Sequence, residues 1–253
     1  MIIVLIFAPT TVLWAVSLRN GDASIIDIFW GPGFALAAWA GAALAPHLGL
    51  RAWLVLALVT LWGLRLGLHI FLRHKGEDHR YATMRRAAGP RWWWRSLFQV
   101  FWLQALLICF ISLPIQFAIA ATAPATMLDG LGAAIALAGL AIETMADRQL
   151  TRFRADPASK GAVMDRGLWA WSRHPNYFGD ALMWWGYFLI GLAASHAWWT
   201  MLCPAMMTFL LLRVSGVALL ESAIAERRPA YADYIRRTSA FVPLPPARKA
   251  RNP

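Results

Sequence analysis

The sequence predicts an all-α, polytopic integral membrane protein in which seven transmembrane helices form one bundle. The chain is 59% hydrophobic and only 15% charged, and its mean hydropathy is +0.51, values that soluble domains rarely combine. Seven stretches come close to the roughly 20 apolar residues that a spanning helix needs. Basic residues cluster between alternate pairs of these stretches, as the cytoplasmic loops of a membrane protein require.

The predicted spans follow one another along the whole chain, and no soluble domain, tandem repeat or low-complexity linker interrupts them. We therefore expect a single membrane domain over residues 1–253. The spans are Ile2–Leu18, Ile25–Pro46, Trp53–Leu72, Leu97–Ala121, Leu128–Met145, Phe178–Ala194 and Trp198–Leu220.

The first two stretches differ in what they carry. Ile2–Leu18 lacks the basic n-region and the small-residue cleavage site of a signal peptide, so we expect it to stay as the first span. Ile25–Pro46 carries Asp27 near its start, and Gly31-Pro32-Gly33 should kink this helix or open it locally. An ionisable residue at membrane depth usually faces the bundle interior. Asp27 is therefore a candidate functional residue, unless it is a helix-end charge that reaches the interface.

The third stretch carries Arg65, His69 and Arg73 at successive i, i+4 positions, which places them along one face of a helix. Arg73 is close enough to the helix end to reach the membrane surface instead. The fourth stretch, Leu97–Ala121, follows three tryptophans at 92–94, which suit an aromatic belt at the membrane surface.

The loop between the third and fourth stretches reads Arg73-His-Lys-Gly-Glu-Asp-His-Arg-Tyr81. This mixture of donors, acceptors and one phenol suits a polyanionic ligand that also has hydroxyl groups. Asp78 could accept hydrogen bonds from ribose hydroxyls, while Arg73, Lys75 and Arg80 could bind phosphates through charge-assisted hydrogen bonds.

The fifth stretch ends with Glu143 and Asp147 one turn apart, and the loop that follows adds the cations Arg152, Arg154 and Lys160. The sixth stretch begins with polar residues around Pro175, which suits the first turn of a helix. Free N–H groups at such a helix start bind anions, and Asn176 and Asp180 lie one turn apart on the same face. The alternative is that Ser-Arg-His-Pro-Asn at 172–176 is only a helix cap with interfacial charge.

The charge pattern predicts sidedness. The net charge is +11, and most basic residues lie in Arg73–Arg95, Arg148–Arg173 and Arg227–Arg251, whereas Thr122–Thr126 and Ser195–Trp198 contain no Lys or Arg. By the positive-inside rule the three basic runs face the cytoplasm, which places the N-terminus outside and the C-terminus inside. Arg51 is an exception to this rule. We attribute the positive charge to topology and to anionic membrane lipids rather than to nucleic acid.

Cysteine usage excludes two classes of site. Cys109 and Cys203 both lie within apolar stretches, and neither has a second thiol or a histidine at ligand spacing. We therefore expect neither a disulfide framework nor a metal site.

Four segments together carry a family resemblance: Gly167–Asp180, the loop Gly-Glu-Asp-His-Arg-Tyr, the element Asp-Ile-Phe-Trp-Gly, and the tail from Tyr231 to Pro243. In these segments the chain resembles the bacterial membrane proteins of the DUF1295 family, which is allied to the steroid 5-alpha-reductases. The resemblance covers most of the chain and is strongest from Glu143 to Pro243.

The resemblance to these reductases implies a seven-helix bundle, in the inner membrane of a bacterium, that binds NADPH from the cytosolic side. It would reduce the carbon–carbon double bond of a steroid-like or other lipophilic enone. Residues 1–121 would then form the substrate side and residues 122–253 the cofactor-binding half, with no obligate protein partner. The cofactor-binding set comprises Arg65, Arg73, Asp78, Arg80, Asp147, Arg154, Lys160, Arg173, His174, Asn176, Tyr177, Asp180, Arg213 and Glu221, the last in place of an aromatic phenol.

The pair that polarises the substrate carbonyl in these reductases, a Glu in span 2 and a Tyr in span 3, transfers less directly. Asp27 is a shorter substitute for the Glu. The Tyr position falls near Trp62 or Gly63, which leaves Tyr81 as the nearest phenol in sequence. A protonated Asp27 would hydrogen-bond the carbonyl oxygen and stabilise the developing enolate, while a hydride enters at the beta carbon and a solvent proton at the alpha carbon.

Two other functions remain open. The segment Arg173–Gly179 also resembles the helix opening of isoprenylcysteine carboxyl methyltransferases, which use S-adenosylmethionine. The cationic loops favour a ligand with several phosphates, which S-adenosylmethionine lacks. The third possibility is a non-catalytic lipid-binding membrane protein, against which the inward-facing polar residues argue.

Overall fold

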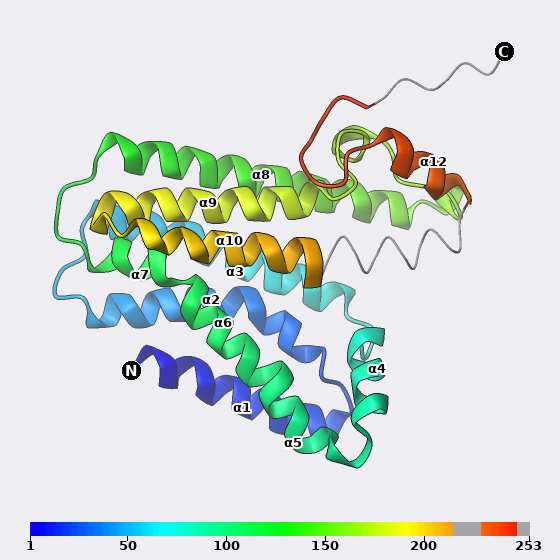
Figure 1. The fold of residues 1–253 in the computed structure, drawn as a ribbon, viewed down its shortest axis with the longest axis horizontal. Helices are drawn as coiled ribbons and strands as arrows, with labels where there is room; N and C mark the ends of the chain where they lie inside the picture. Colours follow the sequence, from blue (N-terminus) through cyan, green and yellow to red (C-terminus); the bar gives the residue numbers. More distant parts are fainter. Residues whose placement is uncertain (215–228, 247–253) are drawn as a thin grey trace. The chain divides into compact units, whose positions relative to one another are not determined.

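The computed structural model describes residues 1–214 and 229–246, and every regular element within these ranges is a helix (Figure 1). Five helices in this part of the chain are long and apolar enough to cross a membrane: Ile2–Asn20, Ile25–Leu44, Leu50–Arg73, His79–Ile111 and Met127–Ala155. The chain is therefore a multi-pass helical membrane protein. Helix α9 (Pro175–Ser195) and a shorter apolar helix, Trp198–Val214, follow these five.

The predicted spans match helices closely at the start of the chain. They correspond to α1 (Ile2–Asn20), α2 (Ile25–Leu44) and α3 (Leu50–Arg73). Helix α8 (Met127–Ala155) continues well past Met145, the expected end of the fifth span, because polar residues on its last turns still keep helical periodicity. Helix α9 begins at Pro175, as the proline predicted.

The fourth and seventh predicted spans consist of several pieces. The fourth comprises η2 (Leu97–Trp102), α6 (Leu103–Ile111) and α7 (Leu113–Ala120), with Pro114 in the first turn of α7, and α5 (Trp92–Ser96) directly precedes it. The loop before them contains α4 (His79–Ala88) and η1 (Gly89–Arg91). The seventh begins as η5 (Trp198–Met201), α10 (Leu202–Phe209) and η6 (Leu210–Val214), and its remainder lies outside the described residues. The other short elements are η3 (Pro157–Ser159), η4 (Gly167–Ala170) and, in the tail, α12 (Pro229–Arg237).

The described chain divides into two compact units. Unit 1 comprises residues 1–130 and 190–203, and unit 2 comprises residues 131–189 with the chain from residue 204 onward. Each unit has its own buried side chains and its own candidate site residues.

Close packing of α2 on α3 organises unit 1. Helix α2 stays helical through Pro32, without the local opening that Gly31-Pro32-Gly33 suggested. The glycines instead allow α2 and α3 to approach each other closely, because a Cβ built on Gly31 would lie 2.5 Å from the carbonyl oxygen of Gly63 in α3. Beside this crossing, the rings of Phe34 and Trp62 pack with their centroids 5.8 Å apart. The backbones thus meet where a larger side chain would not fit.

Arg51, the exception to the positive-inside pattern, is buried in unit 1. Its Nε donates to Asp129 Oδ1 at 2.6 Å and its Nη2 to Asp129 Oδ2 at 2.9 Å. The guanidinium also donates to the carbonyl oxygens of Ala123 and Pro124 at 3.0 Å each. The cation therefore joins the start of α3 to the start of α8, so it needs no cytoplasmic location.

In unit 2, α8 and α9 lie side by side (Figure 1), and glycines again allow the approach. A Cβ built on Gly139 of α8 would lie 2.5 Å from the carbonyl oxygen of Gly179 in α9, and one on Gly186 would lie 2.6 Å from the backbone of Ala136. The tail packs against the loop before α9, where Tyr234 Oη donates to the carbonyl oxygen of Trp169 at 2.5 Å.

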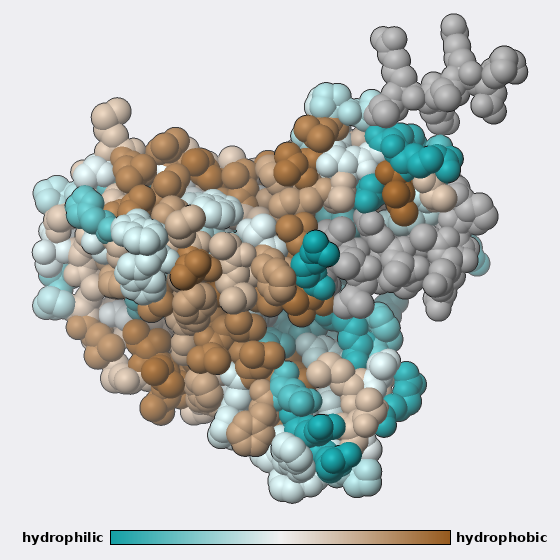
Figure 2. All heavy atoms as spheres, in the orientation of Figure 1, coloured by the Kyte–Doolittle hydropathy of each residue, from teal (hydrophilic) through white to brown (hydrophobic). Residues whose placement is uncertain are grey.

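The surface agrees with a membrane environment. Along α3 the exposed fractions of Leu61, Leu64, Leu68, Phe71 and Leu72 lie between 58% and 71%, and these residues form one helical stripe. In Figure 2 hydrophobic side chains cover the lengths of the helices, whereas hydrophilic side chains gather at α4 and at α12. Such an apolar stripe is suited to contact with lipid chains.

Candidate functional site

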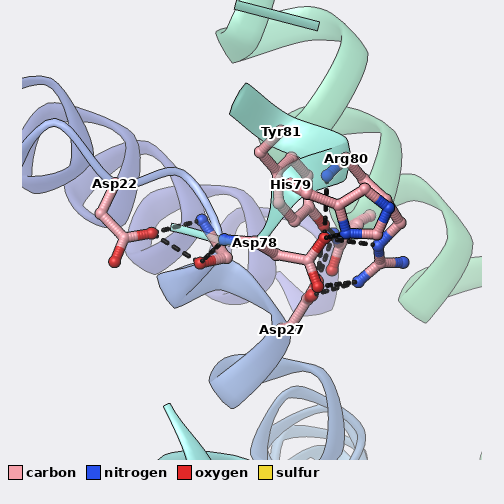
Figure 3. A network of polar contacts seen from close by, with 8 residues as sticks. Asp22, Asp27, Asp78, His79, Arg80 and Tyr81 are labelled. Carbon is pink, nitrogen blue, oxygen red and sulfur yellow. Dashed lines mark hydrogen bonds and ion pairs between the residues drawn. The ribbon is translucent and has the colours of Figure 1, made fainter. Parts of the chain in front are cut away.

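Unit 1 contains a cluster of five polar side chains, which we call the acid–phenol cluster: Asp27, Asp78, Arg80, Tyr81 and Gln104. Tyr81 Oη donates to Asp27 Oδ1 at 2.6 Å, and Arg80 Nη2 donates to Asp27 Oδ2 at 3.1 Å (Figure 3). From α6, Gln104 Nε2 lies 3.2 Å from Tyr81 Oη. Tyr81 is 8% exposed and Asp27 27%. The two residues expected to polarise a carbonyl are thus in direct contact.

Asp78 fixes the arginine of this cluster. Its carboxylate caps α4 by accepting from the Arg80 backbone N–H at 2.9 Å and also accepts from Arg80 Nε at 3.0 Å. Burial alone raises the pKa of Asp78, but these hydrogen bonds and the Arg80 charge outweigh it and hold the pKa below its ordinary value. Arg80 is therefore held between two carboxylates, Asp27 and Asp78, rather than left available to a phosphate.

Hydrogen bonds and ion pairs connect two loops of unit 1 next to the cluster. Asp22 accepts a hydrogen bond from Ser24 Oγ at 2.6 Å and lies 2.8 Å from His74 Nε2. Glu77 accepts from the backbone N–H of Ala23 at 3.0 Å and pairs with Arg85. The loop before α2 is thereby joined to the loop before α4, which accounts for the meeting of Asp27 and Tyr81.

The cationic stripe on α3 is present as a helical face, but its members differ in exposure. Arg65 and His69 are partly buried, whereas Arg73 is exposed at the end of the helix. Arg73 Nη1 lies 3.1 Å from His69 Nε2. This position suits the interfacial alternative for Arg73.

Unit 2 contains a second polar group along the facing sides of α8 and α9. Glu143, Asp147 and Asp180 are at most 6% exposed. Asn176 Nδ2 donates to Asp147 Oδ1 at 3.2 Å, and Trp184 Nε1 donates to Asp180 Oδ1 at 3.0 Å. The contact between Asp147 and Asn176 joins two of the positions that the reductase resemblance assigns to the cofactor.

The residues that precede and open α9 mainly hold the tail of unit 2. Arg173 Nη1 donates to the carbonyl oxygens of Ile235 and Thr238 at 2.9 and 2.6 Å. The buried His174 stacks on Tyr177, with ring centroids 5.6 Å apart and planes 2° from parallel. Arg173, one of the residues expected to bind cofactor here, thus has a structural use that the sequence did not reveal.

The remaining predicted cofactor residues are at the surface or beyond the described chain. Arg154, Lys160 and Arg213 are exposed. Glu221 lies outside the described residues, so its predicted role stays a prediction.

Two polar residues escaped the sequence prediction, which rested on acidic and basic side chains at membrane depth. Gln104 is a lone amide within an apolar stretch, and it contacts Tyr81. Tyr187 is 1% exposed, and its hydroxyl has no hydrogen-bond partner in the described chain. Tyr187 follows Asp180 by two helical turns, a spacing that could have indicated a shared face.

The side chains of Glu143, Asp147, Asn176 and Asp180, which we call the polar face of α8 and α9, include one buried acceptor that is open to a ligand. Asn176 Oδ1 is buried and accepts no hydrogen bond from a described residue, because the amide N–H₂ is directed to Asp147. An acceptor of this kind suits a ribose hydroxyl or a carboxamide N–H, and the exposed side chains of Arg154 and Lys160 suit phosphates. In residues 1–214 and 229–246, no group of three or more His, Cys, Asp or Glu side chains could hold a metal ion.

Comparison with known proteins identifies the family but no activity. The chain is similar to an uncharacterized protein of Schizosaccharomyces pombe, with 26% identity over 272 residues that cover 95% of this chain and 78% of the relative. No solved structure matches the chain. A family described as proteins of unknown function, DUF1295, matches residues 13–238. This match includes both the acid–phenol cluster and the polar face of α8 and α9. The chain belongs to the DUF1295 family.

Proposed function

We propose that this protein is an NADPH-dependent membrane reductase that acts on a carbon–carbon double bond conjugated to a carbonyl in a lipophilic, steroid-like substrate. The contact of 2.6 Å between Tyr81 and Asp27 carries the proposal. A buried phenol held by a protonated carboxyl group and an amide is a suitable donor for a carbonyl oxygen. The resemblance to the steroid 5-alpha-reductases supports the same chemistry.

In this mechanism Tyr81 is the residue that hydrogen-bonds the carbonyl oxygen. When Asp27 is protonated, its carboxylic O–H donates a hydrogen bond to Tyr81 Oη, and the phenolic hydrogen becomes available to the substrate. Gln104 orients the phenol from the other side, and Arg80 stabilises the carboxylate whenever the proton has left. The cofactor, when bound, supplies a hydride to the beta carbon. Asp27 thus acts through Tyr81, whereas the sequence suggested that it contacts the carbonyl directly.

The polar face of α8 and α9 is the proposed contact for the cofactor's ribose and carboxamide groups. Asn176 presents its free oxygen as an acceptor while Asp147 fixes the orientation of its amide. Asp180 is oriented by Trp184 in the same way. These side chains would serve binding and alignment, since they carry no group that needs to change protonation during hydride transfer.

We also propose that the chain crosses the inner membrane of a bacterium seven times, with its N-terminus outside and its C-terminus in the cytoplasm. The five apolar helices, together with α9 and the apolar helix that begins at Trp198, supply seven candidate spans. The basic runs then all fall on one side. The burial of Arg51 against Asp129 removes the one clear objection from the charge pattern.

The proposal is tested first by ligand binding to the detergent-purified protein. A ligand that binds only the folded state raises the unfolding free energy, by about 2.7 kcal/mol at a hundred times its Kd. We expect NADPH to raise the midpoint of thermal unfolding of the wild type and to lose most of this effect in Asn176→Ala. Arg148→Ala serves as the matched control, because Arg148 is exposed on the same helix as Asp147.

Parallel titrations with S-adenosylmethionine and NADH distinguish the alternative functions and the alternative cofactor. If S-adenosylmethionine stabilises the protein and NADPH does not, the chain is a methyltransferase and the hydride mechanism is wrong. If neither ligand changes the unfolding midpoint, a non-catalytic lipid-binding protein becomes the better description. NADH in a parallel titration determines which nicotinamide cofactor is preferred.

A further inference from the structure

Unit 2 contains a surface hollow that the proposed reductase site does not use. It has a volume of about 370 Å³, and we call it the α8 hollow. One wall comes from the last turns of α8, and the other comes from the loop that leads to α9. The lining residues are Gln149, Arg152, Phe153, Asp156, Ser159, Met164, Arg166 and Gly167.

The α8 hollow lies on the opposite side of α8 from the predicted cofactor residues. Successive residues of an α-helix are about 100° apart around its axis. Asp147 and Arg154 are seven positions apart and share one face. Gln149, Arg152 and Phe153 fall about 120° to 160° away from Asp147 by the same geometry. The α8 hollow is therefore separate from the contact between Asp147 and Asn176.

The charge of the hollow is positive because its arginines lack acidic partners. The side chains of Arg152 and Arg166 are exposed and form no ion pair or hydrogen bond with any described residue. The guanidinium of Arg166 lies 5.9 Å from the centre of the Phe153 ring. The acidic member of the lining, Asp156, is engaged as the cap of η3, where it accepts from the N–H of Ala158 at 3.0 Å and from Ser159 Oγ at 3.3 Å.

The loop wall of the hollow is held in place by specific contacts. Gln149 Oε1 accepts from the backbone N–H of Leu168 at 3.0 Å. Gly167 has a φ of +59°, and a Cβ at this position would lie 2.7 Å from Gln149 Oε1, so the turn requires glycine. Beyond this turn, Trp169 Nε1 donates to the carbonyl oxygen of Ala146 at 3.1 Å. Arg166 therefore projects from a loop wall whose backbone is fixed, and Arg152 projects from the helical wall formed by α8.

The tail of unit 2 adds a further support from the other side of the loop. Asp165, next to Arg166, pairs with Arg237 of α12. With its partner supplied by the tail, Asp165 does not neutralise Arg166. The same loop is fixed by Tyr234, which donates to Trp169. The cationic character of the hollow is thus preserved by an ion pair formed elsewhere.

We propose that the α8 hollow binds the phosphate group of an anionic ligand. Arginine presents a planar fork of donors that matches phosphate oxygens, and two such forks flank one hollow. The apolar side chains Phe153 and Met164 provide a wall for the non-polar part of the ligand. The hollow lies at the end of a helix that is apolar and long enough to cross a membrane. A phospholipid headgroup and a soluble phosphate ester offer this same chemistry.

The test uses the purified protein in a neutral detergent and two probes that separate these sources. Short-chain phosphatidylglycerol supplies a phosphate within a lipid, and glycerol 1-phosphate supplies it without acyl chains. The readout is the concentration of each probe that gives half of its shift in the thermal unfolding midpoint. The variant combines Arg152→Gln and Arg166→Gln, and Arg148→Gln is the matched control on the same helix. All three arginines are exposed, so we expect these variants to fold as the wild type does.

We expect at least one probe to stabilise the wild type and Arg148→Gln alike, and to bind the double variant about tenfold more weakly or worse. A response to phosphatidylglycerol alone identifies a lipid headgroup site, and a response to glycerol 1-phosphate identifies a site for soluble phosphates. The proposal is overturned if neither probe stabilises the wild type, or if the double variant responds as Arg148→Gln does. No turnover is measured, so the outcome is independent of the proposed reductase activity.

Discussion

At the scale of single residues, the position of one proton decides what the acid–phenol cluster can do. Tyr81 and Asp27 are 2.6 Å apart, so one hydrogen lies between their oxygens. Arg80 favours the ionised carboxylate, and a carboxylate takes the phenolic hydrogen away from any substrate. A protonated Asp27 leaves the phenolic hydrogen of Tyr81 available to the substrate. The cluster therefore supports catalysis only if Asp27 is protonated when substrate is bound.

This reasoning predicts the effect of removing a single hydroxyl. Tyr81→Phe keeps the ring that packs with Ala23 and Trp92 but removes the proposed donor to the carbonyl. We expect kcat for reduction of a 3-oxo-4-ene steroid with NADPH to fall by about 10²-fold or more, while the NADPH-induced stabilisation stays unchanged. The measurement is the initial rate of NADPH oxidation at saturating substrate.

Thr10→Val is the matched control for this variant. It also removes a buried hydroxyl from unit 1, but this hydroxyl donates only to carbonyl oxygens of its own helix, those of Ile6 and Phe7. The control should retain wild-type activity. Equal rates for Tyr81→Phe and Thr10→Val would exclude Tyr81 from the chemistry.

At the scale of helices and loops, sequence patterns predicted elements better than contacts between them. The lengths of the apolar stretches predicted the ends of α1, α2 and α3 within a few residues, and Pro175 predicted the start of α9. The meeting of Asp27 with Tyr81 could not be read in the same way, because it depends on α4 and on the loop contacts of Asp22 and Glu77. Helix periodicity carries information over a few turns, whereas these partners are 54 positions apart.

The different surroundings of two glycines predict opposite effects for the same substitution. Gly31 lies at the crossing of α2 and α3, whereas Gly130 has open space around it. Gly31→Ala would place a methyl group 2.5 Å from a backbone oxygen of α3, and we expect a loss of about 1–3 kcal/mol in unfolding free energy. Gly130→Ala in α8 meets no atom within 4 Å. It should stabilise by about 0.5–1 kcal/mol, since alanine favours the helix.

The midpoints of thermal unfolding of the two glycine variants in detergent make this comparison directly. A destabilised Gly31→Ala beside a stabilised Gly130→Ala supports the close crossing. Two variants that both gain stability would show that the helices are farther apart than the structure places them.

The cap of α4 predicts a dependence on acid. The pKa of Asp78 is lowered in the folded protein, so this carboxylate contributes stability at pH values above its ordinary pKa of about 4. The contribution should disappear as the pH falls below about 4 towards the lowered value. Asp78→Asn should be less stable than the wild type near neutral pH, and the difference should shrink in acid. Thermal unfolding of both proteins between about pH 6 and pH 3 measures it; a constant difference would contradict the assignment.

At the scale of the whole molecule, the sequence predicted a helical membrane protein and its family correctly, but it could not show which cations are available to a ligand. The predicted cofactor residues illustrate the reason. Arg173 and Arg80 resemble phosphate ligands in a list of cations, yet each is engaged by groups of its own unit. Charge alone does not distinguish a cation that is available to a ligand from one that holds a loop. Only the contacts make that distinction.

Sidedness is the property of the whole chain that a direct experiment can decide. We expect His196, between the sixth and seventh proposed spans, to face the outside, and Lys160 and Leu244 to face the cytoplasm, because the positive-inside rule assigns the basic loop and the basic tail to the cytoplasmic side. All three residues are exposed in the described chain. Single cysteines at these positions, in a background of Cys109→Ala and Cys203→Ala, are treated with a membrane-impermeant maleimide in intact spheroplasts.

Only His196→Cys should react before the membrane is permeabilised, and all three should react afterwards. Labelling of Leu244→Cys in intact spheroplasts would place the tail outside and remove the seventh crossing. Labelling of Lys160→Cys would instead reverse the orientation of the loop between α8 and α9. In that case the polar face, the exposed cations and the α8 hollow would all lie on the side of the membrane where cytosolic NADPH is absent, and the reductase proposal would fail with the topology.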